Sequence, residues 1–301
     1  MRHNRNDKLI RLLLIIASTI SIITTIGILF SIIFQAIEFF QLKSFWYFIT
    51  GTEWSPGHAD SRFGALPIFA GTFMITAIAL LVAIPTGVGS AIYMSEYASH
   101  RQRNILKPAL EILAGIPTVV YGFFAALTIA PAIVNICESM GVSAAYNSAL
   151  ASGTVMGVMI IPVISSLSDD VLRAVPNSQR NASLALGLTH SETIRHIVVP
   201  SAMPGIISAS LLGLSKAIGE TMIVVMAAGL RPNLSWNPLE DMTTVTVRIV
   251  DSLVGDQAFN SPETLSAFAL GLVLFVITLL LNVLSLAQIR KFKARYKINT
   301  L

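Results

Sequence analysis

Two charged residues, Lys216 and Glu220, lie within an otherwise apolar run at residues 205–229, GIISASLLGLSKAIGETMIVVMAAG. A charged side chain at the centre of a lipid bilayer costs about 2.5–3.5 kcal/mol on insertion scales, so it is rarely retained without a role. Four positions apart on a helix, the two side chains would share one face and could form an ion pair. Such a pair could lock this helix to a neighbour, or the same face could line a path for an anion.

The second interpretation gives each residue a role. Lys216 would be a transient cationic binding site for the anion along its path. Glu220 would hold the lysine in place or accept a hydrogen bond from the substrate. Phosphate at neutral pH still carries a proton to donate, whereas sulfate carries none, so a carboxylate could tolerate phosphate and repel sulfate. The neighbouring hydroxyl residues, Ser215 and Thr221, belong to the same candidate path.

The composition indicates that lipid surrounds this helix. Of 301 residues, 54% are hydrophobic and 12% are charged, against about a quarter charged in soluble proteins. Backbone amides in lipid must pair internally, so apolar runs of about 20 residues should be helices. We therefore predict an all-α integral membrane protein with six transmembrane helices, roughly Leu12–Ile37, Leu66–Tyr93, Ile112–Ile133, Ala144–Leu167, Pro204–Gly229 and Leu265–Gln288.

The basic residues orient these spans. Fifteen of the 20 lysines and arginines fall on one side, four on the other, and Lys216 lies inside the fifth span. The positive-inside rule then places both termini in the cytoplasm. The first span is too long for a signal-peptide core and no small-residue cleavage pattern follows it, so we expect an uncleaved anchor. Because topology explains the positive charge, no nucleic-acid partner is expected.

Prolines and glycines predict how the helices bend and pack. Pro85, Pro117 and Pro162 fall inside predicted spans, where each should kink a helix or free a carbonyl. Gly153 and Gly157 form a GxxxG pattern in the fourth span, which is typical of close helix packing.

No constellation for catalysis or metal binding is present in the sequence. There is one cysteine, and the five histidines all fall outside the predicted spans. We therefore expect no catalytic residues and no metal site, and a membrane-embedded enzyme is disfavoured. A phosphate-cradling G-x-x-x-x-G-K-[ST] loop is also missing from the sequence, so ATP would have to be bound by a separate subunit.

The connection between the fourth and fifth spans, residues 175–204, has helix signals. NASLALG contains helix formers and then Gly187, which can end a helix. Ser191 and Glu192 should start a second helix, which Pro200 and Pro204 should break before the fifth span. This pattern predicts a short helix on the cytoplasmic face, standing clear of the membrane.

The same connection resembles the coupling loop of permease subunits of ATP-binding-cassette (ABC) importers, which reads EAA, three residues, Gly, nine residues, Ile-x-Leu-Pro. Asn181 stands where the family usually has Glu, and Val199 replaces the Leu. The resemblance implies that this coupling loop docks into a groove on a cytoplasmic ATPase. The matching positions are Ala182, Ser183, Gly187, Ile197 and Pro200.

Three further stretches look like the phosphate-specific (Pst) permeases: residues 63–98, EILAGIPTVVYGFFA at 111–125 and KAIGETMIVVMAAG at 216–229. The last stretch, with the long segment after it, looks more like the PstC type than its sister type PstA. In that family arginine is common at the position of Lys216; lysine keeps the charge but loses the bidentate fork.

The resemblance implies a type I ABC importer permease (MetI-like) fold in a bacterial inner membrane. Its partners would be a PstA-type sister permease, two PstB-type ATPases that bind ATP and Mg, and a PstS-type phosphate-binding protein. The expected division of the chain is an anchor helix and periplasmic segment at 1–65, the permease domain at 66–290 and a basic cytoplasmic tail at 291–301.

Several interpretations stay open. The cargo could be sulfate, molybdate or an organic solute, and an ion-coupled secondary transporter is a different class, disfavoured because no inverted repeat is found. Glu111 should open the third span, as a boundary group or a gate. Asp169 and Asp170 should be solvated boundary groups, and residues 239–257 could form a short helix at the mouth.

Overall fold

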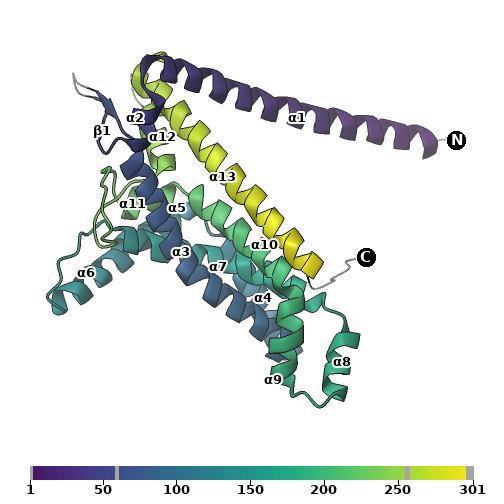
Figure 1. Ribbon diagram of the computed structural model, residues 1–301. Helices are drawn as coiled ribbons and strands as arrows, with labels where there is room; N and C mark the ends of the chain where they lie inside the picture. The colour runs from purple at the N-terminus through teal and green to yellow at the C-terminus, as the bar shows by residue number, and fades with distance from the viewer. Residues whose placement is uncertain (1–2, 58–60, 255–257, 296–301) are drawn as a thin grey trace.

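The computed structural model describes residues 3–57, 61–254 and 258–295, which are almost wholly helical (Figure 1). By length and composition, six of its helical segments could cross a membrane, which confirms the predicted all-α class and span number. These segments are Leu9–Leu42, Leu66–Tyr97, Thr118–Ser139, Ala149–Arg173, His190–Ile218 and Pro262–Leu284.

The elements follow one another along the chain with π-helical turns (η) between some helices. A ribbon of two strands, β1 and β2, each two residues long, is the one departure from the all-α expectation in the described residues. The elements are α1 (His3–Leu42), α2 (Phe45–Thr50), β1 (Trp54–Ser55), β2 (Arg62–Phe63), α3 (Leu66–Ile92), η1 (Tyr93–Tyr97), α4 (His100–Gly115), α5 (Thr118–Phe124), η2 (Ala125–Ile129), α6 (Ala130–Ser139), α7 (Ala149–Arg173), α8 (Asn177–Ala185), α9 (His190–Thr193), η3 (Ile194–Val198), α10 (Val199–Ile218), α11 (Met222–Ala227), α12 (Val245–Leu253) and α13 (Pro262–Arg295).

Helices α3 and α7 form the centre of the main core. A Cβ atom on Gly153 would lie 2.8 Å from Ile78, and one on Gly157 would lie 2.8 Å from the Ala79 carbonyl oxygen. The two glycines therefore let the helix backbones approach closely, as the GxxxG pattern predicted. Fully buried residues such as Ile160 fill the space around this contact.

Aromatic side chains build a second core beside the β ribbon. Phe39, from the end of α1, packs edge-to-face against Phe48 and Phe63, with ring centroids 5.4 Å apart in each pair. Trp54 packs on Phe63 in the same way and is 8% exposed. Trp46, in contrast, is 74% exposed.

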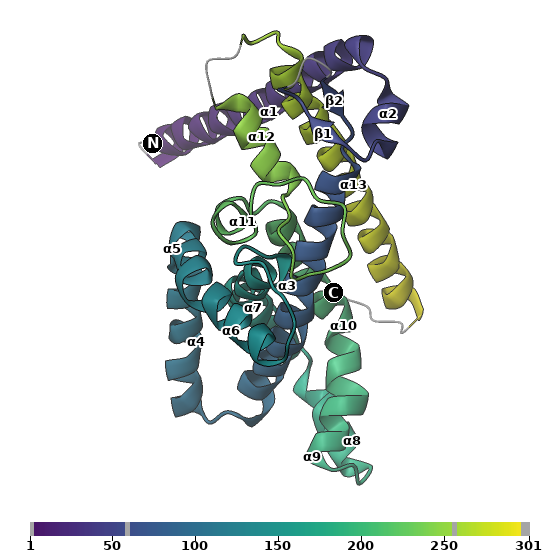
Figure 2. The same cartoon turned by 90° about the vertical axis from the view of Figure 1, so that its left-hand side faces the viewer.

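The molecule has two distinct ends (Figures 1 and 2). Helices α8 and α9 lie at one end, and α2, the β ribbon and α12 lie at the opposite end. The N-terminal part of α1 projects away from the bundle with its apolar side chains exposed, as a lipid-facing anchor would. The predicted short helix within residues 239–257 is present as α12, and its place at the mouth of a path stays a prediction.

The third span differs from its predicted bounds. Pro117 does not kink one helix: α4 ends at Gly115 and a new helix, α5, begins at Thr118. The hydroxyl of Tyr121 donates to the Leu113 carbonyl oxygen at 2.9 Å and so satisfies an acceptor near the end of α4. Pro85 and Pro162, in contrast, lie inside the continuous helices α3 and α7.

The expected division of the chain stays a prediction. The start of α3 at Leu66 coincides with the expected start of the permease domain. The backbone of α13 is helical to Arg295, so the expected tail at 291–301 begins inside that helix. Residues 296–301 lie outside the described residues.

Candidate functional site

The apolar run that carries Lys216 and Glu220 is not one helix. α10 ends at Ile218, and α11 begins at Met222. The prediction that the two charges share one helical face is therefore wrong. Gly219, which caps α10, was a signal for this interruption, but the long apolar run around it favoured one continuous helix.

The carboxylate of Glu220 explains why the helix stops. Its Oε1 accepts hydrogen bonds from the backbone N–H groups of Met222, at 3.0 Å, and Ile223, at 3.4 Å. A side chain that satisfies the first amides of a new helix offers the backbone an alternative to continuing the old one. Glu220 is 8% exposed, so this carboxylate is a buried part of the helix break.

A second contact holds the break from α12. The hydroxyl of Thr246 donates to the backbone oxygen of Glu220 at 2.8 Å. The start of α12 is fixed in turn to α3, because the N–H of Val245 donates to the Thr72 hydroxyl at 3.0 Å. Glu220 is thus held through both its side chain and its backbone.

Lys216 lies in the last turn of α10 and is half-buried. The end of a helix carries partial negative charge, which favours a cation there. In the part of the chain that the structure describes, no carboxylate lies within 4.0 Å of Lys216, so the predicted ion pair with Glu220 is not formed. Ser215 is exposed and Thr221 is half-buried, on either side of the break.

The coupling loop contains the predicted short helix, α8, at one end of the molecule (Figure 2). Ser183 faces inward, and its hydroxyl lies 2.5 Å from that of Thr193. Gly187 has a φ of +89°, in the left-handed region that favours glycine, and turns the chain after α8. Asn181 and Ala182 are exposed on α8, so the Asn181 departure from the family's Glu lies on the surface.

The second half of the coupling loop differs from its prediction. Thr189 caps α9 together with Glu192 in a reciprocal capping box, so Ser191 is not the helix start. Pro200 occupies the first turn of α10, where its missing N–H is tolerated, and helix continues from η3 into α10. The predicted break before the fifth span is therefore wrong. Ile197, in η3, is half-buried.

A charged cluster lies where α4 meets α7. Asp169 is fully buried and makes ion pairs with Arg103 at 2.6 Å and with Arg173 at 3.3 Å. The prediction that Asp169 is a solvated boundary group is wrong; Asp170, 58% exposed, is paired with Lys107 at 2.9 Å. Arg103 and Lys107 lie 66 and 63 positions from the aspartates they bind, so no local pattern could have revealed those pairs, whereas Arg173 is only four positions from Asp169.

Glu111 is exposed and lies within α4. It does not open the third span, which begins after Pro117. Nothing brings it near Glu220 or Lys216 among the described contacts, and its gate role stays a prediction.

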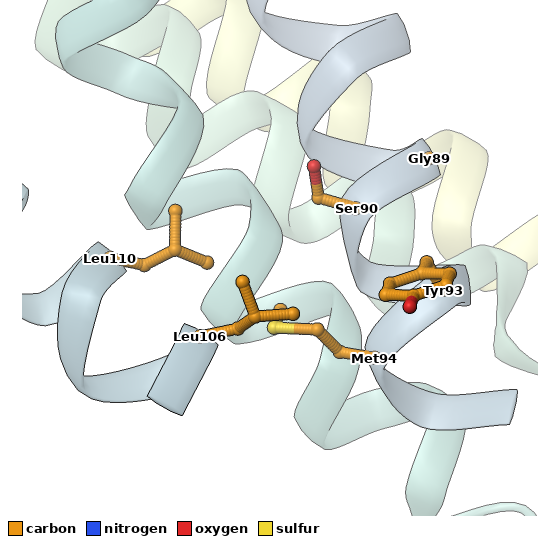
Figure 3. A pocket seen from close by; sticks show the side chains of 6 residues that line it. All are labelled: Gly89, Ser90, Tyr93, Met94, Leu106 and Leu110. Carbon is orange, nitrogen blue, oxygen red and sulfur yellow. The ribbon is translucent and has the colours of Figure 1, made fainter. Parts of the chain in front are cut away.

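A hollow of about 410 Å³ opens between α3 and α4 (Figure 3). Its lining is mostly apolar, and none of the predicted site residues belongs to it. The lining residues are Gly89, Ser90, Tyr93, Met94, Leu106 and Leu110.

Comparison with known proteins agrees with this architecture. Residues 83–297 match the family model described as "Binding-protein-dependent transport system inner membrane component". The chain is 36% identical over 251 residues to a probable ABC transporter permease protein, YqgH, of Bacillus subtilis, covering 83% of this chain and 78% of that protein. It is 35% identical over 278 residues to the phosphate transport system permease protein PstC 1 of Mycobacterium tuberculosis, covering 81% and 82%.

Solved structures show the same fold at low sequence identity. A chain of the MetNI methionine ABC transporter in inward-facing conformations superposes with a TM-score of 0.55 at 17% identity, covering 76% of this chain and 94% of that one. A chain of a bacterial ABC transporter for alginate import gives 0.56 at 12% identity, with coverages of 88% and 96%. The fold is that of type I ABC importer permeases, and with the family match it shows that the chain belongs to the binding-protein-dependent transport system inner membrane components.

Proposed function

We propose that this chain is the permease subunit of an ATP-driven phosphate importer in a bacterial inner membrane, with both termini in the cytoplasm. The observation that carries the proposal is its similarity, over most of its length, to several phosphate transport system permease proteins of the PstC type. The distribution of basic residues supports the orientation, since α8 and the start of α4 lie on the basic side.

The geometry of the helix break supports an anion as cargo. Lys216 provides an ammonium group that no carboxylate in the described residues neutralises. One oxygen of Glu220 is engaged by backbone N–H groups, and its other oxygen, Oε2, has no hydrogen-bond partner among the described residues. Lys216 would attract the anion, and Oε2 would accept the proton that phosphate carries and sulfate lacks.

One lysine is too little charge to hold a dianion tightly. A transport path should release its cargo, so tight capture would belong to a PstS-type binding protein above the membrane. Ser215 is exposed in the single chain, which fits a path completed by a PstA-type sister permease.

The coupling loop would receive the driving force. Leu184 and Leu186 are 46% and 82% exposed on and just after α8, beside exposed Ala182. Exposed apolar side chains on a short helix fit insertion into a groove of a partner protein. We assign this groove to PstB-type ATPases, two per assembly, which would bind the ATP and Mg.

The test is uptake of labelled phosphate and sulfate by vesicles that contain the full assembly. Lys216→Gln should lower phosphate uptake about tenfold or more, since a charge contact is worth about 1.5–3 kcal/mol. Lys216→Arg should retain most uptake because it keeps the charge. The control is Lys43→Gln, which removes a charge near the end of α1, outside the candidate path.

Glu220→Gln should also lower phosphate uptake, because an amide oxygen is a weaker acceptor than a carboxylate. Unchanged uptake in both Lys216→Gln and Glu220→Gln would refute the path assignment. A wild-type assembly that accumulates sulfate as well as phosphate would refute phosphate as the specific cargo.

A further inference from the structure

A buried ion pair connects α8 to the end of α3. The guanidinium of Arg180, on α8, bonds the carboxylate of Glu96, in η1, across 84 sequence positions. The Glu96 side chain is 3% exposed and that of Arg180 is 19% exposed. A pair this deeply buried is costly to break, because the partner left behind is an uncompensated charge.

Arg180 also reaches the end of α7. Its Nη2 donates to the Leu172 carbonyl oxygen at 2.9 Å, so one planar guanidinium joins α8 to two membrane helices. On the Glu96 side, the Ser95 hydroxyl donates to Oε1 of the carboxylate at 2.8 Å. The carboxylate is therefore oriented by its own helical segment before Arg180 binds it.

The other side-chain hydrogen bonds of α8 in the described residues lead elsewhere. Ser183 bonds Thr193, on α9, and Gln179 accepts from Ser201, on α10, at 3.3 Å. These contacts tie α8 to the chain that follows it. Arg180 is the residue that ties α8 to helices that precede it.

The opposite end of α3 is bonded to the segment that holds the helix break. Thr72, in the second turn of α3, accepts from the N–H of Val245, and the adjacent Thr246 donates to Glu220. Between these ends, Leu66–Tyr97 is one continuous helical segment packed along α7. α3 thus spans the molecule from the coupling loop to the start of α12 (Figure 1).

We propose that α3 is the element that carries displacement of α8 to the break at Glu220, with Glu96–Arg180 as its input contact and Thr72–Val245 with Thr246–Glu220 as its output contact. This inference rests on the proposed function and adds positioning residues to it. Spatial connection alone does not establish coupling, so the prediction concerns the number of anions moved per ATP hydrolysed, and not activity alone.

The experiment uses the full assembly, reconstituted with its partner subunits, and measures phosphate uptake and ATP hydrolysis in the same vesicles. Glu96→Gln should lower the ratio of phosphate transported to ATP hydrolysed about tenfold, within the usual range of coupling between sites. The exchange of both charges, Glu96→Arg with Arg180→Glu, should restore the ratio to within about threefold of wild type if the pair acts as a contact. Asp170→Asn is the control, since it neutralises an exposed, ion-paired carboxylate elsewhere.

The output contact is tested with two variants, one that removes the Thr246 hydroxyl and one that keeps it. Thr246→Val removes the hydroxyl that donates to Glu220 and should lower the ratio about fivefold or more. Thr246→Ser keeps the hydroxyl and should keep the ratio of phosphate transported to ATP hydrolysed near that of wild type. Combining Glu96→Gln with Thr246→Val should be no worse than the more severe single change, because both interrupt one linkage.

Normal ratios in Glu96→Gln or in Thr246→Val would overturn the proposal, as would independent effects that multiply in the combined variant. If the Glu96→Gln permease fails to assemble, the variant with both charges exchanged decides. If that variant assembles but its ratio of phosphate transported to ATP hydrolysed stays low, the input contact is contradicted. If its ratio is near that of wild type, the contact is supported. A wild-type assembly that hydrolyses ATP but moves another anion would refute phosphate as cargo; the coupling ratios would then be measured with that anion.

Discussion

Two buried carboxylates, Glu220 and Asp169, are stabilised in different ways. Glu220 is held by backbone amides at the start of α11, whereas Asp169 is surrounded by cationic side chains from α4 and α7. Removing the acceptor at Glu220 should therefore loosen a helix start. Removing the charge at Asp169 should leave cations without a counter-charge.

The role of Glu220 in the helix break is tested by comparing two substitutions. Glu220→Gln keeps a side-chain oxygen that can accept from Met222, whereas Glu220→Ala does not. Loss of a cap costs about 1 kcal/mol, so Glu220→Ala should melt at a lower temperature than Glu220→Gln in detergent. Equal melting temperatures would show that the carboxylate does not stabilise the break.

The neighbouring aspartates provide a matched comparison for the buried cluster. Asp169→Asn should destabilise the protein by about 3 kcal/mol, since Asp169 is fully buried and the partly buried cations around it would lose their central counter-charge. Asp170→Asn should change stability by less than about 1 kcal/mol, because its ion pair is solvent-exposed. Chemical unfolding of both variants measures the difference, and similar losses would contradict the assigned burial.

At the scale of elements, glycines decide how closely α3 can approach its neighbours. A Cβ atom on Gly71 would lie 2.2 Å from the Thr243 carbonyl oxygen, whereas none of the surrounding atoms lies within 4 Å of a Cβ on Gly89. The first position fixes α3 against the segment that leads into α12. The second faces the hollow beside α4.

Gly71→Ala should therefore destabilise the protein by about 1–3 kcal/mol, the usual cost of overpacking. Gly89→Ala, in the same helix, should be neutral or slightly stabilising, since alanine is the better helix former. Thermal unfolding of the two variants checks this, and a well-tolerated Gly71→Ala would mean that α3 and Thr243 can separate freely.

The segment that returns from α11 to α12 is fixed by hydrogen bonds to Glu240. The side-chain amide of Asn233, with further bonds from Ser235 and Asn237, holds the pKa of Glu240 below its ordinary value of 4.5. A lowered carboxyl pKa stabilises the fold above pH 4.5, and this stabilisation is lost as the pH falls through the lowered value. The amide hydrogen-exchange rates of residues 230–241, corrected for intrinsic rates, should thus change little from pH 7 to 5. Faster exchange at pH 5 than at pH 7 would contradict the lowered pKa of Glu240.

The sequence predicted those elements that depend on local composition. Apolar length located six spans, GxxxG predicted close packing of the fourth span, whose partner proves to be α3, and Gly187 located the end of α8. It failed where tertiary contacts decide: Pro200 is accommodated because π-helical η3 precedes it, and Asp169 is buried because Arg103 reaches it from α4. The break at Glu220 depends on which backbone N–H groups its carboxylate accepts hydrogen bonds from, here those of Met222 and Ile223. The residue type alone does not specify these partners.

At the scale of the whole molecule, the two candidate functions occupy different regions. The α8 surface lies at one end of the molecule (Figure 2), whereas Lys216 and the break at Glu220 lie at the C-terminal end of α10. Exposed apolar side chains cover α1 and the outer faces of α13, as lipid contact requires. Within the described residues, the chain thus presents exposed α8 and a lysine without an ion pair at separate places. The proposed function would require partners to enclose a path and to supply energy.

The most direct test is ATP-dependent accumulation of labelled phosphate in vesicles, with wild-type assembly compared with one whose permease lacks residues 182–187. Wild type should accumulate phosphate only when ATP is supplied, and the deletion should abolish both accumulation and attachment of the ATPase. Continued attachment and accumulation after the deletion would contradict the proposed role of α8, and wild-type accumulation that does not need ATP would contradict an ATP-driven importer.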